Sequence, residues 1–260
     1  MSPRVLVGCC GFPISKGKYF ELMKAVEVQR TFYKVPKVTT ARRWRESAPE
    51  DFVFTLKAWA AITHPPRSPI WRKAGIECED CGELRPTEGN FRAWEATLEI
   101  ARELRAEFVV FQSPPSFSRN EERVKNLSDF FSSIDRAGVR IGWEPRHESW
   151  WEGPGELGRL LDSLDLTHVV DPLSRRGEPL DSGPVAYFRL HGRYEGRRIV
   201  YNHQYGDDEI GGICRAVERE LARRERVYVM FNNGRFMLDD ALRFASACGS
   251  VEPGSSQSTK

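Results

Sequence analysis

The chain has 260 residues, of which 40% are hydrophobic and 29% charged, and its formal net charge at neutral pH is +2. This length and composition suffice for a sizeable core in one large domain or two small ones. The near-balanced charge argues against general binding to nucleic acid or anionic membranes, although a local basic patch remains compatible with it. No apolar run approaches the roughly 18 residues of a membrane span, and no signal peptide is evident, so we expect a cytoplasmic protein without membrane contact.

Eight short apolar runs, rich in β-branched and aromatic residues, predict eight strands. They span residues 4–8, 25–29, 51–57, 107–112, 139–144, 167–171, 185–191 and 226–233. Between them, apolar residues at three- and four-residue steps, such as Phe91, Trp94 and Leu98, predict helices. Because strands that alternate with helices pair in parallel, the sequence predicts an α/β fold with one (β/α)₈ barrel, a TIM barrel. An open doubly wound sheet is disfavoured, since "VGCCGF" lacks the dinucleotide-binding fingerprint.

Two segments depart from the alternation. Residues 172–184 connect the sixth and seventh strands without a clear helix, and residues 58–90 form a long insertion after the third strand. Loops of this length inside a compact domain are usually functional or disordered. We therefore expect one barrel domain over residues 1–248, followed by a flexible tail over residues 249–260.

Polar or reactive side chains follow every predicted strand, where a barrel of this kind assembles its active site. They are Cys9, Cys10, Glu27, Gln29, Lys57, Gln112, Glu144, Arg146, His147, Asp171, Arg189, His191, Asn232 and Asn233. Any one of them has a structural alternative, because strand ends also carry ion pairs that only satisfy buried charge. Together they predict a ring of polar groups around the barrel mouth.

Six ordered motifs resemble those of the YecE-like family, catalogued as domain of unknown function 72. They are "VEVQRTFYKVP", "FTLKAWAAITH", "FQSPPSF", "EPRHESW", "FRLHG" and "VYVMFNN". The resemblance implies a TIM-barrel fold, similar to sugar-isomerase and endonuclease IV-like barrels, and no established activity. The positions that match the family's motifs are Glu27, Lys57, Thr63, His64, Arg146, His147, Arg189, His191 and Asn232. The chain departs from the commoner family form at "GCCGF", which replaces a Gly-Thr-Ser-Gly-type turn.

Two kinds of metal site are compatible with these residues. Cys9, Cys10, Cys78 and Cys81 all lie on the predicted C-terminal side of the barrel and would suit zinc or an iron–sulfur cluster if folding brings them together. The alternatives are buried free thiols, or a disulfide or redox pair at Cys78 and Cys81. A second possible ligand set, of oxygen and nitrogen atoms, comprises Glu27, His64, Glu144, His147, Asp171 and His191.

Acid–base chemistry without a metal is the third interpretation, and we expect an enzyme that acts on a phosphate-bearing substrate. In it Lys57, Arg146 and Arg189 bind the anion with His64 and Asn232, while Glu27, His147 and His191 transfer protons or bind a metal. The alternative is a nucleic-acid-binding or processing protein that uses the same mouth. Its predicted contacts are Lys16, Lys18, Arg193, Arg197, Arg198, Arg235, Trp59, Trp71, Trp150, Trp151 and Tyr194.

Overall fold

The computed structural model describes residues 4–196 and 198–249 and confirms the predicted barrel. Eight parallel strands close on themselves, each pairing with the neighbours that the alternating pattern implies. They are β1 (Val5–Cys10), β2 (Ala25–Val28), β3 (Val53–Lys57), β4 (Phe108–Gln112), β5 (Arg140–Glu144), β6 (Thr167–Val170), β7 (Val185–Leu190) and β10 (Arg226–Phe231). Each overlaps one predicted run, so the apolar pattern located the whole sheet.

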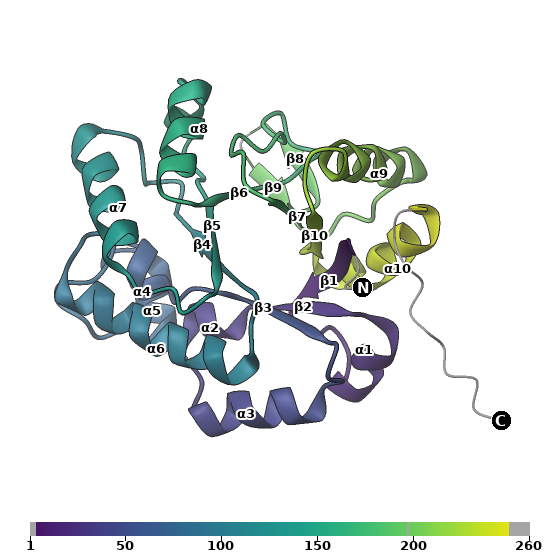
Figure 1. The fold of residues 1–260 in the computed structure, drawn as a ribbon, viewed down its shortest axis with the longest axis horizontal. Coiled ribbons are helices and arrows are strands. Elements are labelled where there is room, and N and C mark those ends of the chain that lie inside the picture. The colour runs from purple at the N-terminus through teal and green to yellow at the C-terminus, as the bar shows by residue number, and fades with distance from the viewer. Residues whose placement is uncertain (1–3, 197, 250–260) are drawn as a thin grey trace.

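Helices surround the strands (Figure 1). They are α1 (Lys16–Leu22), α2 (Arg30–Tyr33), α3 (Val38–Ser47), α4 (Ala60–Thr63), α5 (Pro69–Ala74), α6 (Glu88–Leu104), α7 (Glu121–Ser133), α8 (Pro154–Ser163), α9 (Asp207–Leu221) and α10 (Met237–Ala247), with 3₁₀ turns η1 (Glu148–Trp151) and η2 (Gly234–Phe236). Local chemistry sets their ends: the Thr87 hydroxyl accepts the Asn90 N–H at the start of α6, and Gly75 ends α5 with a φ of 61°. No helix within the described residues has the length and hydropathy that crossing a bilayer requires.

The strands separate two apolar cores because their side chains alternate between the faces of the sheet. A small core inside the barrel includes Leu6, Phe108, Tyr187 and Tyr228, and a larger core lies between the barrel and its helices. Gly142 faces the interior, where a Cβ would lie 2.6 Å from the Phe108 ring. A glycine is therefore required at this position so that the large aromatic rings fit inside the barrel.

The connection between β6 and β7 contains no helix, as the sequence predicts. The side chain of Arg224, from the turn after α9, anchors this segment instead. Its guanidinium donates to the Asp181 carboxylate at 2.8 Å and to the carbonyl oxygens of Gly183 at 2.6 Å and Val185 at 2.9 Å. A buried arginine thus supplies part of the packing that a helix would provide elsewhere around the barrel.

A hairpin that the sequence analysis did not identify follows β7. Its strands β8 (Arg193–Glu195) and β9 (Arg198–Val200) pair in antiparallel fashion beside the barrel (Figure 1). Arg197, one of the predicted nucleic-acid contacts, lies outside the described residues, as does the predicted tail beyond Gly249.

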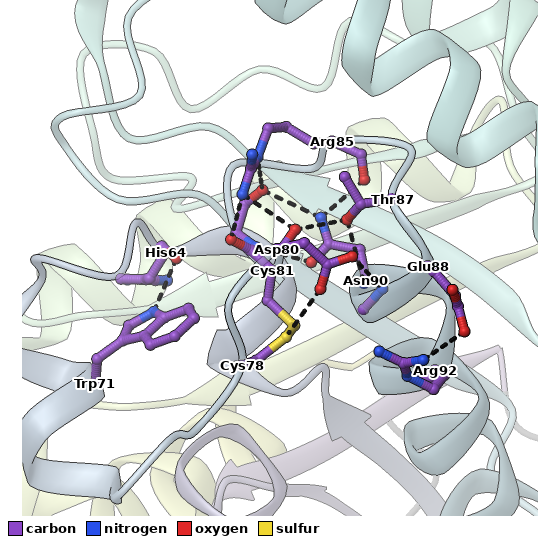
Figure 2. The surroundings of a disulfide bond; sticks show 12 residues. His64, Trp71, Cys78, Asp80, Cys81, Arg85, Thr87, Glu88, Asn90 and Arg92 are labelled. Atoms are coloured by element: carbon purple, nitrogen blue, oxygen red, sulfur yellow. Dashed lines mark hydrogen bonds and ion pairs between the residues drawn. A yellow bond between two sulfur atoms is a disulfide. The ribbon is translucent and has the colours of Figure 1, made fainter.

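The insertion after β3 is ordered and contains α4 and α5 followed by a loop that a disulfide between Cys78 and Cys81 closes. Figure 2 shows how polar contacts hold this loop against the start of α6. The Asp80 carboxylate accepts the Gly89 N–H at 2.9 Å, and the Asn90 side chain bonds both the N–H and the carbonyl of Gly82. The loop is therefore a fixed wall beside α4 rather than a disordered segment.

Candidate functional site

Most of the predicted polar residues point into the barrel at its C-terminal end. They lie two or four residues beyond interior apolar residues on the same strand, and alternation gives them the same inward direction. The inward set is Cys10, Glu27, Lys57, Gln112, Glu144, Asp171, Arg189, His191 and Asn232, and Arg146 joins it through contacts with Gln112, Glu144 and His191. The predicted ring of polar groups therefore exists, above the aromatic layer of the interior.

Arg189 occupies the centre of this ring and is bound by two carboxylates. Its Nη2 lies 3.0 Å from Oε1 of Glu27, its Nη1 contacts Oε2 of Glu144, and Gln112 accepts a further hydrogen bond at 3.1 Å. The side chain is 0% exposed. Burial lowers the pKa of Arg189, but Glu27 and Glu144 outweigh this effect and raise it. Its guanidinium is thus largely engaged by protein groups, which leaves little capacity for the anion predicted from the sequence.

Glu27 is held from its other side by groups that the sequence analysis missed. The Tyr187 hydroxyl donates to Oε2 of Glu27 at 2.9 Å and lies 2.7 Å from the Thr55 hydroxyl, and the Gln29 amide contacts Oε1. Tyr187 precedes Arg189 by two residues, and Thr55 precedes Lys57 by two. That spacing was the signal available, because it places each pair on one face of its strand.

His191 is fixed between Glu144 and Asn232. Its Nε2 lies 3.0 Å from Oε1 of Glu144, and its Nδ1 lies 3.0 Å from the Asn232 amide nitrogen. Nε2 also lies 2.9 Å from Nη2 of Arg146, so it faces both a donor and an acceptor, and the contact at Nδ1 decides the tautomer. Because the Asn232 amide nitrogen donates to Nδ1, the neutral ring carries its proton on Nε2. Burial, followed by the charge of Arg146, lowers the pKa of His191 to about 3. The ring therefore stays neutral throughout the physiological range.

Arg146 is the most accessible cation of the ring. Its Nη2 lies 2.7 Å from Oε1 of Glu144, and 14% of its side chain is exposed. Its Nε is buried without a hydrogen-bond partner, and its Nη1 makes no hydrogen bond within the part of the chain that the structure describes. Arg189 also has a buried Nε without a partner, but both of its Nη atoms are bound, so Arg146 has more donors to spare for a ligand.

Lys57 lies at the end of β3 with its ammonium group 3.5 Å from the centre of the Phe32 ring. It has no hydrogen bond or ion pair to any described residue, although its side chain is buried. Burial, then the charge of Arg189, lowers the pKa of Lys57 to about 7. The His64 ring also packs against Phe32, edge to face with 5.2 Å between the ring centres, and burial together with Lys57 lowers the pKa of His64 to about 3. The Lys57 amine near the arginines of the barrel mouth is therefore neutral in about half of the molecules at pH 7.

Asp171 follows β6 and is also perturbed. Its carboxylate accepts the backbone N–H groups of His191 at 2.9 Å and Leu173 at 3.0 Å, and the Tyr194 hydroxyl at 3.2 Å. Burial nevertheless raises the pKa of Asp171 to about 6. This carboxylate joins the β8–β9 hairpin to the barrel and orients the backbone of His191.

Several predicted site residues lie outside this ring. His147 contacts Ser149, with 2.8 Å between Nδ1 and Oγ, and begins η1 rather than entering the network. Trp150 is fully buried against Phe117 and Trp143, and Trp71 is buried with its indole N–H on the His64 carbonyl. Neither tryptophan has a free face for a base to stack on.

The structure does not bring the four candidate cysteines together, because adjacent residues of a strand face opposite ways. Cys10 points into the barrel towards Arg189, whereas Cys9 points outward and donates to the Met237 carbonyl at 3.4 Å. Cys78 and Cys81 are joined to each other. Burial raises the pKa of the Cys9 thiol to about 12, which disfavours the thiolate that a metal needs.

Potential metal ligands converge at one place among residues 4–196 and 198–249. The sulfur atoms of Cys78 and Cys81 and a carboxylate oxygen of Asp80 lie within 4.8 Å of one another (Figure 2). They supply three ligands of the four that a structural zinc ion takes, and the two sulfurs are oxidised. The oxygen and nitrogen ligand set predicted from the sequence does not converge in the same way.

One pH-dependent property follows from His168, whose ring points outward from β6. Burial lowers its pKa to about 3. Because the unfolded chain binds a proton below pH 6.5 and the folded chain does not, this group stabilises the fold above pH 6.5 and loses that contribution as the pH falls towards 3. Between pH 7 and pH 5 we expect wild type to lose about 2 kcal/mol more unfolding free energy than His168→Gln. Urea titrations at both pH values measure the difference, and equal losses would contradict it.

A closed (β/α)₈ barrel with ionisable groups gathered at the C-terminal ends of its strands is the architecture of TIM-barrel enzymes. Residues 17–258 match the family described as "Protein of unknown function DUF72". The chain belongs to this family, as its motifs predict.

Known relatives agree with this assignment. The chain is 22% identical to the UPF0759 protein YunF of Bacillus subtilis (strain 168) over 232 residues, which cover 80% of this chain and 76% of YunF. It is similar to the crystal structure of a DUF72 family protein from Enterococcus faecalis V583, with a TM-score of 0.74, 20% identity and coverage of 94% and 97% of the two chains. Endonuclease IV from Thermus thermophilus shares the fold at a TM-score of 0.54 and 16% identity, with coverage of 94% and 100%.

Proposed function

We propose that the protein is an enzyme that binds a small phosphate-bearing substrate at the C-terminal mouth of its barrel. The observation that carries the proposal is the set of cations there with donors left over: the buried Nε atoms of Arg146 and Arg189 lack an acceptor, and the Lys57 ammonium contacts the Phe32 ring and no polar group among the described residues. A buried donor left unpaired costs about 1–3 kcal/mol, and a phosphate oxygen is the acceptor that cations bind best.

The carboxylates and His191 have a different role in this proposal. Glu27 and Glu144 neutralise Arg189, and Glu144 also orients His191 and Arg146. They are positioning residues, which hold the cations and the imidazole in place beneath the substrate. Proton transfer falls instead to Lys57, whose pKa of about 7 suits exchange near neutral pH.

Binding of inorganic phosphate and of glycerol 3-phosphate, followed by isothermal calorimetry, tests the proposal. We expect Arg146→Gln to weaken binding about tenfold or more, since a charge-assisted hydrogen bond contributes about 1.5–3 kcal/mol. The matched control is Arg226→Gln, at the opposite end of the barrel, where Arg226 pairs with Glu107. Equal affinities for the two variants would contradict the proposal.

One observation favours the alternative function, nucleic-acid binding. Tyr201, just after the hairpin, is 45% exposed and lies 6.0 Å from the His191 ring, so an aromatic face is available at the mouth. Exposed Arg193 and Arg198 lie in the β8–β9 hairpin, and exposed Arg235 lies in η2 after β10. A single-stranded oligonucleotide that binds with a steep dependence on salt, and outcompetes phosphate, would favour this alternative over a small substrate.

A further inference from the structure

The surroundings of Lys57 differ from those of a lysine that serves only as a cation. A structural lysine at a barrel mouth is expected to contact a carboxylate, yet the carboxylates of Glu27 and Glu144 pair with arginines instead. The Lys57 nitrogen faces the Phe32 ring, 3.5 Å from its centre. Its side chain is buried, and no described residue accepts a hydrogen bond from it.

The backbone around Lys57 is held firmly. The Thr31 hydroxyl lies 2.6 Å from the Lys57 carbonyl oxygen and 2.9 Å from the Val28 carbonyl oxygen and can donate its one proton to either, which links β3 to the loop after β2. Phe32 belongs to α2 in that loop and is also packed edge to face against the His64 ring. The amine is thus presented from the end of a strand on a fixed apolar platform, which is how sites keep a nucleophile in place.

We propose that the Lys57 nitrogen is a nucleophile that forms an imine with an aldehyde or ketone carbon of the substrate. The inference rests on the proposed function, because it assigns the phosphate of that substrate to Arg146 and its carbonyl carbon to Lys57. The substrate class is therefore a small carbonyl compound that carries a phosphate monoester.

The reaction balances without a cofactor. The lone pair of the neutral amine attacks the carbonyl carbon, and the π electrons of the C=O bond move to oxygen, which takes up the proton that nitrogen releases. The resulting carbinolamine loses its hydroxyl group together with a proton as water, and the nitrogen lone pair forms the C=N bond. One amine and one carbonyl yield one imine and one water, and nothing is oxidised or reduced.

The environment favours each part of this step. Burial and the neighbouring arginines lower the pKa of Lys57 to about 7, so about half of the amine is neutral at pH 7, compared with about 1 in 2,500 for a lysine of ordinary pKa. After protonation of the imine nitrogen, Glu27 and Glu144 lie near enough to stabilise the positive charge, since both act on the charge of Lys57. The same arginines that keep the amine neutral oppose the charge of the protonated imine, and the two carboxylates offset part of that repulsion.

Reductive trapping tests the inference on the wild-type protein. Glycolaldehyde phosphate is the probe, glycolaldehyde is its neutral counterpart, and sodium cyanoborohydride delivers hydride to the imine carbon to give a stable secondary amine. Peptide mass spectrometry then compares labelling of Lys57 with that of Lys125, whose side chain is 76% exposed. We expect Lys57 to be labelled at least about tenfold faster, and inorganic phosphate to slow labelling by the phosphorylated probe.

The outcomes separate the two proposals. Labelling of Lys57 no faster than that of Lys125 would overturn the imine, even if phosphate binds in an Arg146-dependent manner and so supports the proposed function. If Lys57 is labelled selectively but at equal rates by both probes, and inorganic phosphate does not slow the labelling, the imine is supported. The same result would contradict the proposal that the substrate carries a phosphate. Lys57→Arg, which keeps the cation without a nucleophilic amine, should lose the selective adduct while its circular dichroism matches wild type.

Discussion

Replacing Arg189 by methionine should destabilise the fold by about 3–5 kcal/mol at pH 8, because it leaves two buried carboxylates without their shared cation. Glu27 is 0% exposed and loses its guanidinium partner, whereas Glu144 retains Arg146. The difference in unfolding free energy between wild type and Arg189→Met should become smaller as the pH falls to 5. An unpaired carboxylate in a buried site favours proton uptake, so the folded variant gains protons, and with them stability, as the pH is lowered.

Urea unfolding at pH 8 and pH 5 measures both parts of this prediction. The double variant Arg189→Met/Glu27→Gln should recover part of the loss at pH 8, because it removes the unpaired charge together with its partner. A deficit below about 1 kcal/mol, or one that does not change with pH, would show that solvent reaches the cluster and that the barrel interior is wetter than the burial of these side chains implies.

Replacing Arg224 by methionine should also cost about 3–5 kcal/mol of unfolding free energy, at the opposite end of the barrel. The Arg224 side chain is 1% exposed and pairs with Asp181 and Glu220, besides the carbonyls of the helix-free connection. Its loss leaves two carboxylates partly unpaired and frees several backbone acceptors. Amide hydrogen exchange should accelerate in residues 171–184 before it does elsewhere.

The neighbouring residue supplies a matched control. Arg223 also pairs with Glu220, but its side chain is 53% exposed, so Arg223→Met should cost no more than about 1 kcal/mol. Arg224→Lys should give an intermediate loss, because an ammonium keeps the charge but cannot reproduce the planar fork that bonds carboxylate and carbonyls together. Similar losses for the Arg223 and Arg224 variants would contradict the prediction that burial determines the effect.

The barrel and the ring of polar groups were predictable from the sequence because both depend on local periodicity. Strand alternation places residues two apart on one face, and each predicted strand ended in polar residues. The opposite orientations of Cys9 and Cys10 followed from the same rule, although their place on the same side of the predicted barrel as Cys78 and Cys81 suggested a shared ligand set. The β8–β9 hairpin also had a local signal in the sequence, the glycine at position 196, which adopts a φ of 61° in the turn. A search for apolar patterns does not detect such a turn residue.

The state of Arg189 was not predictable in the same way. Whether a buried cation binds a ligand or only satisfies protein charge depends on which carboxylates approach it, and Glu27 lies 162 residues away in the chain. The predicted anion-binding role assumed that all three cations share one environment. The structure separates them into Arg189, held by two carboxylates, Arg146, held by one, and Lys57, held by none of those described.

The Glu27–Arg189–Glu144 cluster also implies that the strands stabilise the fold while the loops determine ligand selectivity. The two carboxylates of this cluster exceed its one guanidinium by a single negative charge, which Arg146 balances through Glu144, so the cluster and Arg146 together form a nearly neutral floor. Under the proposed function, a substrate therefore gains little by reaching deeper into the barrel. Selectivity must then come from the rim, where the insertion after β3 and the β8–β9 hairpin lie. Changes in those two segments can alter which molecule is accepted while the floor keeps the barrel folded, so a new specificity need not weaken the scaffold.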